Sequence, residues 1–294
     1  MTDLLHPAGD LDVLLYYSKV APKLKGFLKG KEIAARVLIP NFRPLLNRGS
    51  KLPPLSAEEL AKVDEALLKM RSGGTKLESA RGGLTPLQEK IWRYFPPRKL
   101  ADLFYATNTE KGKKIDRIFF DLDRGEGTTL EEAQKATALL VEEMHNDEKL
   151  KAALTPGFEF FIMYTGSSFH IYLMLKKEAE GGAYDKHFAY SKNDPLSSLT
   201  GRWVESVRKN GIRISGGHEK LPGYLVLDPS QTPPGKLARA PFSLHMSDPK
   251  TVDGVAIPIE EKMLKDKNLP KKLKGYGPEK VLEELDSLTK LLPC

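Results

Sequence analysis

The sequence predicts an α+β fold: a mostly antiparallel sheet packed with helices, together with an N-terminal αβ module. Two apolar runs, Phe158–Tyr164 and Phe169–Leu175, flank the turn Thr165–Ser168, a pattern typical of a β-hairpin. Residues 129–144 begin with the capping-box sequence Thr-Leu-Glu-Glu and continue with apolar side chains at helical spacing. Strands and helices thus share a chain of 294 residues, which is long enough for one large domain or two modest ones.

The other elements follow from hydrophobic periodicity and from capping and turn residues. Helices are predicted over 11–28, 56–71, 85–95, within 190–209 and over 278–292, and strands over 33–39, 100–107, 118–123, 224–228 and 255–259. A charged turn is predicted at 110–114. These elements divide the chain into an N-terminal αβ module (1–110), a second module (111–262), and a basic linker with a C-terminal helix (263–294).

Composition narrows the class of protein. Hydrophobic residues make up 40% and charged residues 29% of the chain, as in ordinary globular proteins. The formal net charge of +7 favours a polyanionic partner without identifying it. The one cysteine, Cys294, excludes disulfides and cysteine-ligated zinc. No apolar run reaches membrane-spanning length and no signal-peptide pattern begins the chain, so we expect a cytoplasmic protein without a membrane partner.

A pair of acids ends the predicted strand 118–123. Side chains alternate along a strand, so Asp121 and Asp123 share one face while Leu122 points to the other. Two close carboxylates repel each other unless a cation lies between them, and Mg²⁺ or Mn²⁺ prefers such oxygen ligands. Because Asp-x-Asp is a common sequence, an exposed strand end with alternating acids is the alternative.

A third acid, Asp228, ends the later apolar strand 224–228. If the two strands are neighbours, three carboxylates converge at one edge of a sheet, and this donor set favours Mg²⁺ or Mn²⁺ over zinc. Paired hard metals suit phosphoryl or nucleotidyl transfer. Alternatively, Asp228 is a turn residue that ends its strand ahead of Pro229.

Polar and basic residues near these acids are candidates for phosphate binding. His170 follows a Gly-Ser turn whose Ser167 and Ser168 offer hydroxyl and backbone donors; a structural histidine is the alternative. Lys236, Arg239 and His245 follow Asp228 and could neutralise a triphosphate, or they could form a solvated basic loop. The sequence contains neither a P-loop nor a Gly-x-Ser-x-Gly elbow.

The N-terminal module is rich in basic residues with aromatic residues between them. Such a mixture could clamp a phosphate backbone and stack a base, and it could equally be a solvated helix face above core aromatics. The candidate DNA-binding residues are Lys23, Lys25, Lys29, Lys31, Arg36 and Arg43.

Together these motifs resemble the archaeo-eukaryotic primase superfamily. The superfamily's motifs appear in order as Asp121-Leu122-Asp123, Ser168-Phe169-His170 and Leu227-Asp228. Phe120–Asp123 followed by Gly125-Glu126-Gly127 is similar to the polymerase domain of end-joining DNA ligases. Arg239–His245 is similar to the catalytic small subunit of replicative primases. The turn at 165–168 lacks the Lys or Arg usual in relatives, and the zinc module of replicative subunits is absent.

The resemblance implies that module 111–262 is an RRM-like catalytic module with a two-metal Mg²⁺ or Mn²⁺ site and no zinc. It implies Asp121, Asp123 and Asp228 as catalytic metal ligands. The implied nucleotide-binding residues are Ser167, Ser168, His170, Lys236, Arg239, Ser243 and His245.

The implied activity is template-directed nucleotidyl transfer by a primase-polymerase that extends or initiates DNA or RNA strands. Filling of gaps at 5′-phosphorylated breaks is an alternative within this class, and a catalytically inactive nucleic-acid-binding module is an alternative outside it. The expected partners are a DNA template and primer, nucleoside triphosphates and a primase large subunit, helicase or ligase.

Overall fold

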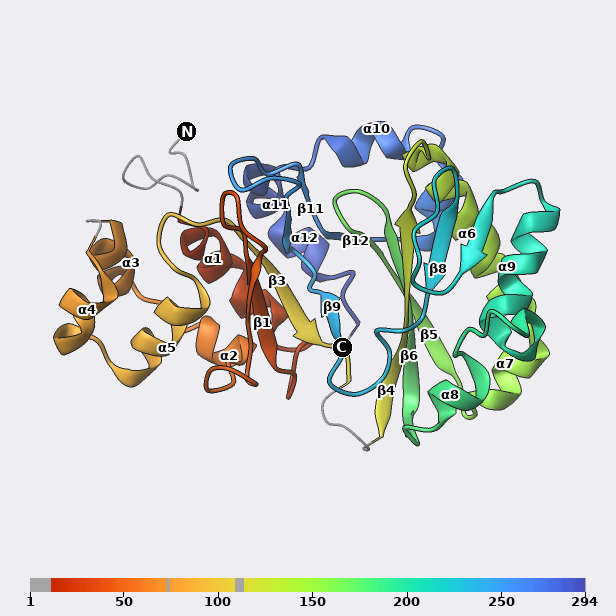
Figure 1. Cartoon of the computed structure of the whole chain (residues 1–294), viewed down its shortest axis with the longest axis horizontal. Coiled ribbons are helices and arrows are strands. Elements are labelled where there is room, and N and C mark those ends of the chain that lie inside the picture. Colours follow the sequence, from red (N-terminus) through yellow and green to blue (C-terminus); the bar gives the residue numbers. More distant parts are fainter. Residues whose placement is uncertain (1–11, 73–74, 109–113, 294) are drawn as a thin grey trace.

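Within the described part of the chain, the fold is built around two large sheets, of four and six strands (Figure 1), and a third sheet of two strands. Aromatic side chains pack between the two large sheets, where Phe27 contacts Tyr105 of one and Tyr172 of the other. The computed structural model describes residues 12–72, 75–108 and 114–293. Except for Lys114, the turn predicted at 110–114 lies outside these residues, as do Leu11 and Cys294. The predicted α+β class with mostly antiparallel sheets is confirmed. Within the described residues, no helix combines the length and apolarity needed to span a membrane.

The first sheet has the order β2-β1-β3-β9, and neighbouring strands run antiparallel. Its strands are β1 (Ile33–Val37), β2 (Leu45–Asn47), β3 (Ala101–Ala106) and β9 (Leu237–Arg239). Strand β9 comes from more than a hundred residues further along the chain, so the first sheet is completed by a segment of the second predicted module. This crossing places Arg239 beside residues of the N-terminal module.

Helices cover the first sheet on its outer side (Figure 1). They are α1 (Leu14–Leu24), α2 (Ala57–Leu60), α3 (Glu65–Ser72), α4 (Leu77–Ala80) and α5 (Pro86–Tyr94), with the 3₁₀ turn η1 (Arg81–Gly83) between α4 and α5. The helix predicted over 56–71 is two helices. Asp64 accepts a hydrogen bond from the backbone N–H of Leu67 and so begins a new helix where a continuous one was expected.

The second sheet has the order β12-β5-β6-β4-β8-β7, in which only the pair β7–β8 is parallel. Its strands are β4 (Ile115–Arg124), β5 (Phe158–Tyr164), β6 (Phe169–Ala179), β7 (Ile214–Gly216), β8 (Leu225–Asp228) and β12 (Ile257–Ile259). Strands β5 and β6 form the predicted hairpin, with Tyr164 opposite Phe169. The paired acids thus lie on β4, which together with β6 forms the long central part of this sheet.

Alternation along β4 sends neighbouring aromatic rings to opposite faces of this sheet. Phe120 packs against Trp203 in the helical layer, with ring centroids 5.7 Å apart. Phe119 packs on the other face against Tyr172, with centroids 5.0 Å apart. The helical layer contains α6 (Leu130–Asn146), α7 (Glu148–Ala153), α8 (Ala183–His187), η2 (Pro195–Ser197) and α9 (Leu199–Lys209). Helix α6 begins with the predicted capping box of Thr129 and Glu132, and α9 lies within the predicted range 190–209.

The C-terminal segment packs against both large sheets. It contains β10 (Leu244–His245), β11 (Gly254–Val255), η3 (Glu261–Lys265), α10 (Leu269–Lys274), α11 (Pro278–Glu283) and α12 (Leu285–Thr289). The strand predicted over 255–259 is divided, because Val255 pairs with β10 while Ile257–Ile259 pairs with β5. The helix predicted over 278–292 is interrupted at Glu284, whose φ of −100° and ψ of 7° leave the helical range.

Candidate functional site

A cavity of about 580 Å³ opens beside the end of β4 that carries the paired acids. Its walls come from both sheets, from the β5–β6 turn and from the loops after β4 and before β8. The lining includes Arg36, Phe104, Phe119, Asp121, Asp123, Arg124, Thr128, Thr165, Ser167, Ser168, His170, Lys220, Gln231, Arg239 and His245. This cavity, called the cleft below, therefore combines carboxylates with several cationic side chains.

Asp121 and Asp123 both line the cleft, as alternation along a strand requires, whereas Leu122 is fully buried. Burial raises the pKa of Asp123, and the neighbouring charge of Asp121 adds to this shift. Burial also opposes ionisation of Asp121, but the charge and hydrogen bond of His170 outweigh it and leave the pKa of Asp121 lowered. One carboxylate is thus held ionised beside a second that resists ionisation.

The third predicted acid, Asp228, stands directly opposite Asp121 in the β4–β8 ladder. Opposite residues of antiparallel strands have their Cβ atoms about 5 Å apart. The Asp228 carboxylate accepts hydrogen bonds from the backbone N–H of Ser230 at 2.8 Å and from its hydroxyl at 2.9 Å, and it is 6% exposed. Asp228 is not among the residues that line the cleft.

Strand pairing therefore brings the three acids to one edge of the sheet, but they do not form a complete set of metal ligands. Among the residues that the structure describes, no group of three His, Cys, Asp or Glu side chains is arranged to hold a metal ion. The donor set of Asp121 and Asp123 nevertheless fits a hard divalent ion, because two carboxylates at the cleft share one face and their charges oppose each other. Asp228, opposite Asp121 on the neighbouring strand, adds a third aspartate at this edge of the sheet.

Nitrogen atoms of basic side chains approach both carboxylates. The Lys220 Nζ atom lies 2.7 Å from Asp123 Oδ1, and His170 Nε2 lies 3.3 Å from Asp121 Oδ1. Lys220 is held near the acids by the loop before β8, whose backbone packs against Gly125: the Gly125 N–H donates to the Tyr224 carbonyl at 2.9 Å. A Cβ atom at Gly125 would overlap the carbonyl of Leu221, so glycine is required for this approach.

The β5–β6 turn carries the predicted phosphate-binding residues to the cleft. Gly166 has a φ of +96°, and a Cβ atom there would overlap the His245 side chain, so glycine allows His245 to pack on the turn. The Ser168 hydroxyl donates to the Leu122 carbonyl, which joins the turn to the acid-bearing strand. The Ser167 carbonyl accepts a hydrogen bond of 3.0 Å from Arg124.

Two arginines form the opposite wall of the cleft. Arg36 on β1 and Arg239 on β9 both form ion pairs with Asp102, which is fully buried. Both guanidinium groups also lie over the Phe104 ring, with their Cζ atoms 5.4 and 5.1 Å from the ring centroid. Arg36, predicted as a DNA-binding residue, therefore shares this wall with the predicted nucleotide-binding residue Arg239. Burial lowers the pKa of His245, and the positive charge of Arg239 lowers it further.

Two of the predicted nucleotide-binding residues, Ser243 and Lys236, do not line the cleft. Ser243 is fully buried and its hydroxyl oxygen accepts a hydrogen bond of 2.9 Å from the Leu103 N–H, so its place is structural rather than in the lining. Lys236 is exposed and lies outside the lining.

The predicted DNA-binding residues differ in their exposure and in whether they form ion pairs. Lys25, Lys29 and Arg43 are exposed. Lys23 forms an ion pair of 2.6 Å with Asp286. Lys31 does not belong to a basic surface: it is 4% exposed, and its Nζ atom lies 2.6 Å from Asp116 Oδ2. A buried ammonium group needs such a partner, and the carboxylate of Asp116 supplies it.

Sequence reasoning missed several residues of the cleft. Arg124 could have been predicted from its position, because it follows Asp123 directly in the sequence. Gln231 and Thr128 lie in loops without a distinguishing pattern. Lys220 could not have been found from local sequence, because only the packing of its loop on Gly125 brings it to the acids.

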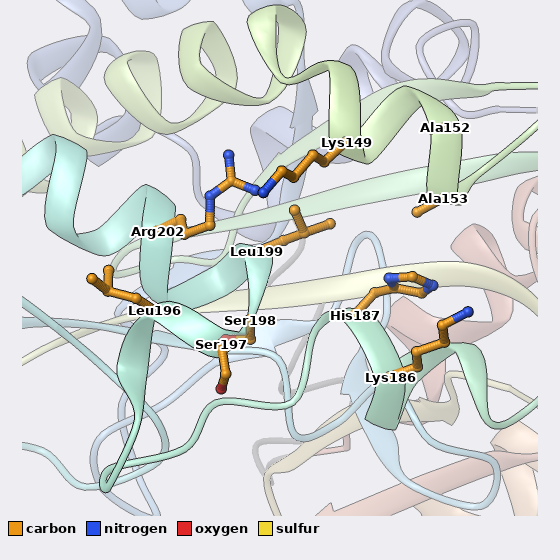
Figure 2. Close-up of a pocket in the computed structure, with 10 residues that line it drawn as sticks. All are labelled: Lys149, Ala152, Ala153, Lys186, His187, Leu196, Ser197, Ser198, Leu199 and Arg202. Atoms are coloured by element: carbon orange, nitrogen blue, oxygen red, sulfur yellow. The ribbon is translucent and has the colours of Figure 1, made fainter.

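A second cavity, of about 530 Å³, lies in the helical layer among α7, α8 and α9 (Figure 2). Its lining includes the basic residues Lys149, Lys186, His187 and Arg202, with no carboxylate among the lining residues. Burial lowers the pKa of His187, and the charge of Lys186 adds to this effect. No residue that the sequence singled out as a site lines this basic cavity.

Comparison with known proteins shows the fold. The chain superposes on the polymerase domain of Mycobacterium tuberculosis Ligase D, solved in complex with DNA, with a TM-score of 0.58 and 19% sequence identity over 99% of this chain and 96% of that chain. No family model matches the sequence, and no curated protein matches it. The resemblance inferred from the motifs is therefore confirmed at the level of the fold.

Proposed function

We propose that this protein catalyses template-directed nucleotidyl transfer and so extends or initiates DNA or RNA strands. One observation carries the proposal: Asp121 and Asp123 share a cleft with Arg36, Arg239 and His245. This arrangement occurs in a chain with the fold of a polymerase domain that was solved with DNA. A nucleic-acid partner also suits the formal net charge of +7.

The side chains of the cleft have complementary tasks in this proposal. Asp121 and Asp123 would hold Mg²⁺ or Mn²⁺, with Asp228 as the neighbouring carboxylate. When bound, such ions supply Lewis-acid activation of the attacking hydroxyl and of the triphosphate. Arg239 and Arg36 would neutralise the triphosphate, and His170 and the Ser167–Ser168 turn would orient its oxygens.

The test is extension of a labelled primer on a template with nucleoside triphosphates and Mn²⁺. We expect extension by the wild type and a loss of about 10³-fold or more for Asp121→Asn, which keeps the shape of the side chain and removes its charge. Asp185→Asn, at an exposed acid on α8, is the matched control and should extend normally. Full extension by Asp121→Asn would overturn the proposal.

Gap filling at 5′-phosphorylated breaks is a more specific form of this activity, favoured by the likeness to the polymerase domain of a DNA ligase. A gapped duplex with and without the 5′-phosphate distinguishes it from priming. A gap-filling enzyme should prefer the phosphorylated substrate, whereas a primase should also begin strands on a bare single-stranded template.

A catalytically inactive nucleic-acid-binding module is the candidate from another class. It is favoured by the hydrogen bonds that Ser230 donates to Asp228 and by the ion pair of Lys220 with Asp123, which leave no three-ligand group ready among the described residues. Template binding without extension under any combination of Mn²⁺ and Mg²⁺ would establish this alternative.

A further inference from the structure

Behind the cleft, buried polar side chains form a row that links the acid pair to the core between the sheets. His170 Nε2 lies 3.3 Å from Asp121 Oδ1, and His170 Nδ1 lies 3.5 Å from the Tyr172 hydroxyl. Tyr105 is the neighbour of Tyr172 in this row, and its hydroxyl accepts a hydrogen bond of 3.4 Å from Arg117. The row therefore runs from a guanidinium group to a carboxylate.

Every member behind Asp121 is shielded from water. Tyr105 and Tyr172 are 0% exposed, and His170 and Arg117 are 4% exposed. The row crosses between the sheets, because Tyr105 belongs to β3 and Tyr172 to β6. At the far end, Arg117 Nε donates to Asp116 Oδ1 at 2.8 Å, so the guanidinium group is anchored on the side away from the tyrosines.

The two contacts of the His170 ring determine the direction of its hydrogen bonds. An ionised carboxylate can only accept, so the contact with Asp121 requires the proton on Nε2. In a neutral imidazole the other nitrogen is then an acceptor, and the Tyr172 hydroxyl is the donor beside Nδ1. In the other tautomer, Nε2 and the Asp121 oxygen would face each other without a hydrogen between them. Buried polar groups are rarely left unpaired, which favours the first tautomer.

We propose that Tyr172 is a positioning residue, which holds the His170 imidazole in the tautomer that carries its proton on Nε2. This inference rests on the proposed function for its catalytic meaning, although the tautomer itself is a property of the chain. Held in this way, Nε2–H points at the acid pair and is available to a phosphate oxygen in the cleft. The edge of the His170 ring also packs on Phe119, with centroids 4.7 Å apart, which restricts rotation of the imidazole.

The tyrosines are suited to this role because they remain protonated donors. Burial raises the pKa of Tyr172 well above its ordinary value. Burial likewise raises the pKa of Tyr105. A hydroxyl that does not ionise at working pH keeps its proton for the neighbouring imidazole.

The test uses ¹⁵N-labelled histidine in the full chain at alkaline pH, where imidazoles are neutral. The signal of His170 is identified by its absence in His170→Gln. In the wild type we expect the proton on Nε2 and an Nδ1 resonance typical of a hydrogen-bonded acceptor. In Tyr172→Phe, which keeps the ring in the core, the Nδ1 resonance should move to the position of a free acceptor. A wild-type proton on Nδ1, or an Nδ1 resonance that Tyr172→Phe leaves unchanged, would overturn the proposal.

Kinetics add a second readout. Tyr172→Phe should lower kcat for primer extension about tenfold with little change in KM, and Tyr105→Phe should have a smaller effect because Tyr172 can still donate to His170. Tyr94→Phe is the control: it removes a buried hydroxyl that donates to the Pro53 carbonyl at 3.1 Å, outside the row. Equal losses in Tyr172→Phe and Tyr94→Phe would contradict a specific role. If the expected resonances appear in a chain without extension activity, the proposed function fails and the tautomer assignment stands.

Discussion

The cleft and the basic cavity are both concave and charged, but their charges are arranged differently. In the cleft, Asp123 forms an ion pair with Lys220 and Asp121 lies against the His170 imidazole, and the buried Asp102 pairs with the two arginines of the opposite wall. In the basic cavity, Lys149 and Lys186 are exposed and their ammonium groups form no ion pair within the described chain. Water stabilises exposed charges, whereas buried charges require partners. Exposed cations without a partner are therefore weaker evidence for a functional site than buried ion pairs at the wall of a cleft.

The largest effect expected from this comparison concerns the wall of the cleft. Asp102→Ala would leave Arg36 and Arg239 without their shared buried carboxylate, and we expect it to lower the free energy of unfolding by about 3 to 5 kcal/mol. Urea denaturation followed by circular dichroism measures the change. Asp286→Ala, which removes an exposed partner of Lys23, is the control and should cost less than about 1 kcal/mol. Similar costs for the two variants would contradict the distinction between buried and exposed pairs.

A smaller effect of opposite sign is expected at the acid pair. Because the pKa of Asp123 is raised in the folded protein, the folded state binds this proton more tightly than the unfolded state. The carboxylate therefore lowers stability progressively as pH rises from its ordinary value, about 3.9, through the raised value, and the full penalty remains at neutral pH.

Without metal at neutral pH, Asp123→Asn should raise Tm by about 1 to 3 °C. The difference from wild type should disappear below about pH 4, and thermal unfolding in EDTA across this range measures it. Addition of Mn²⁺ should stabilise the wild type more than the variant. A variant less stable than wild type at neutral pH without metal would show that the Lys220 ion pair outweighs the repulsion between the acids.

The smallest effects belong to the basic cavity. Lys149→Gln and Lys186→Gln remove exposed cations, so each should change the free energy of unfolding by less than about 0.5 kcal/mol. Primer extension should be unchanged. A clear loss of extension or of template binding in either variant would show that the basic cavity takes part in function.

Local sequence determined a large part of the fold. Helices α5 and α6 begin after Thr85 and Thr129 as predicted, because the capping-box hydrogen bonds found at both join residues three positions apart. The β5–β6 hairpin and the shared face of Asp121 and Asp123 likewise depend on neighbours along the chain. Local sequence was less reliable where a helix is broken, since the apolar spacing around Asp64 and Glu284 continues through the break.

Only the tertiary structure decided how distant segments meet. The sequence supplied Asp228, but strand pairing placed it opposite Asp121, where its carboxylate accepts hydrogen bonds from Ser230 and does not line the cleft. Strand β9 carries Arg239 to Arg36, and burial turns Lys31 from a predicted surface cation into a structural one. Such outcomes depend on which apolar faces bury each other across more than a hundred residues. Residue spacing encodes the periodicity of each element, but it does not specify which elements will pack together.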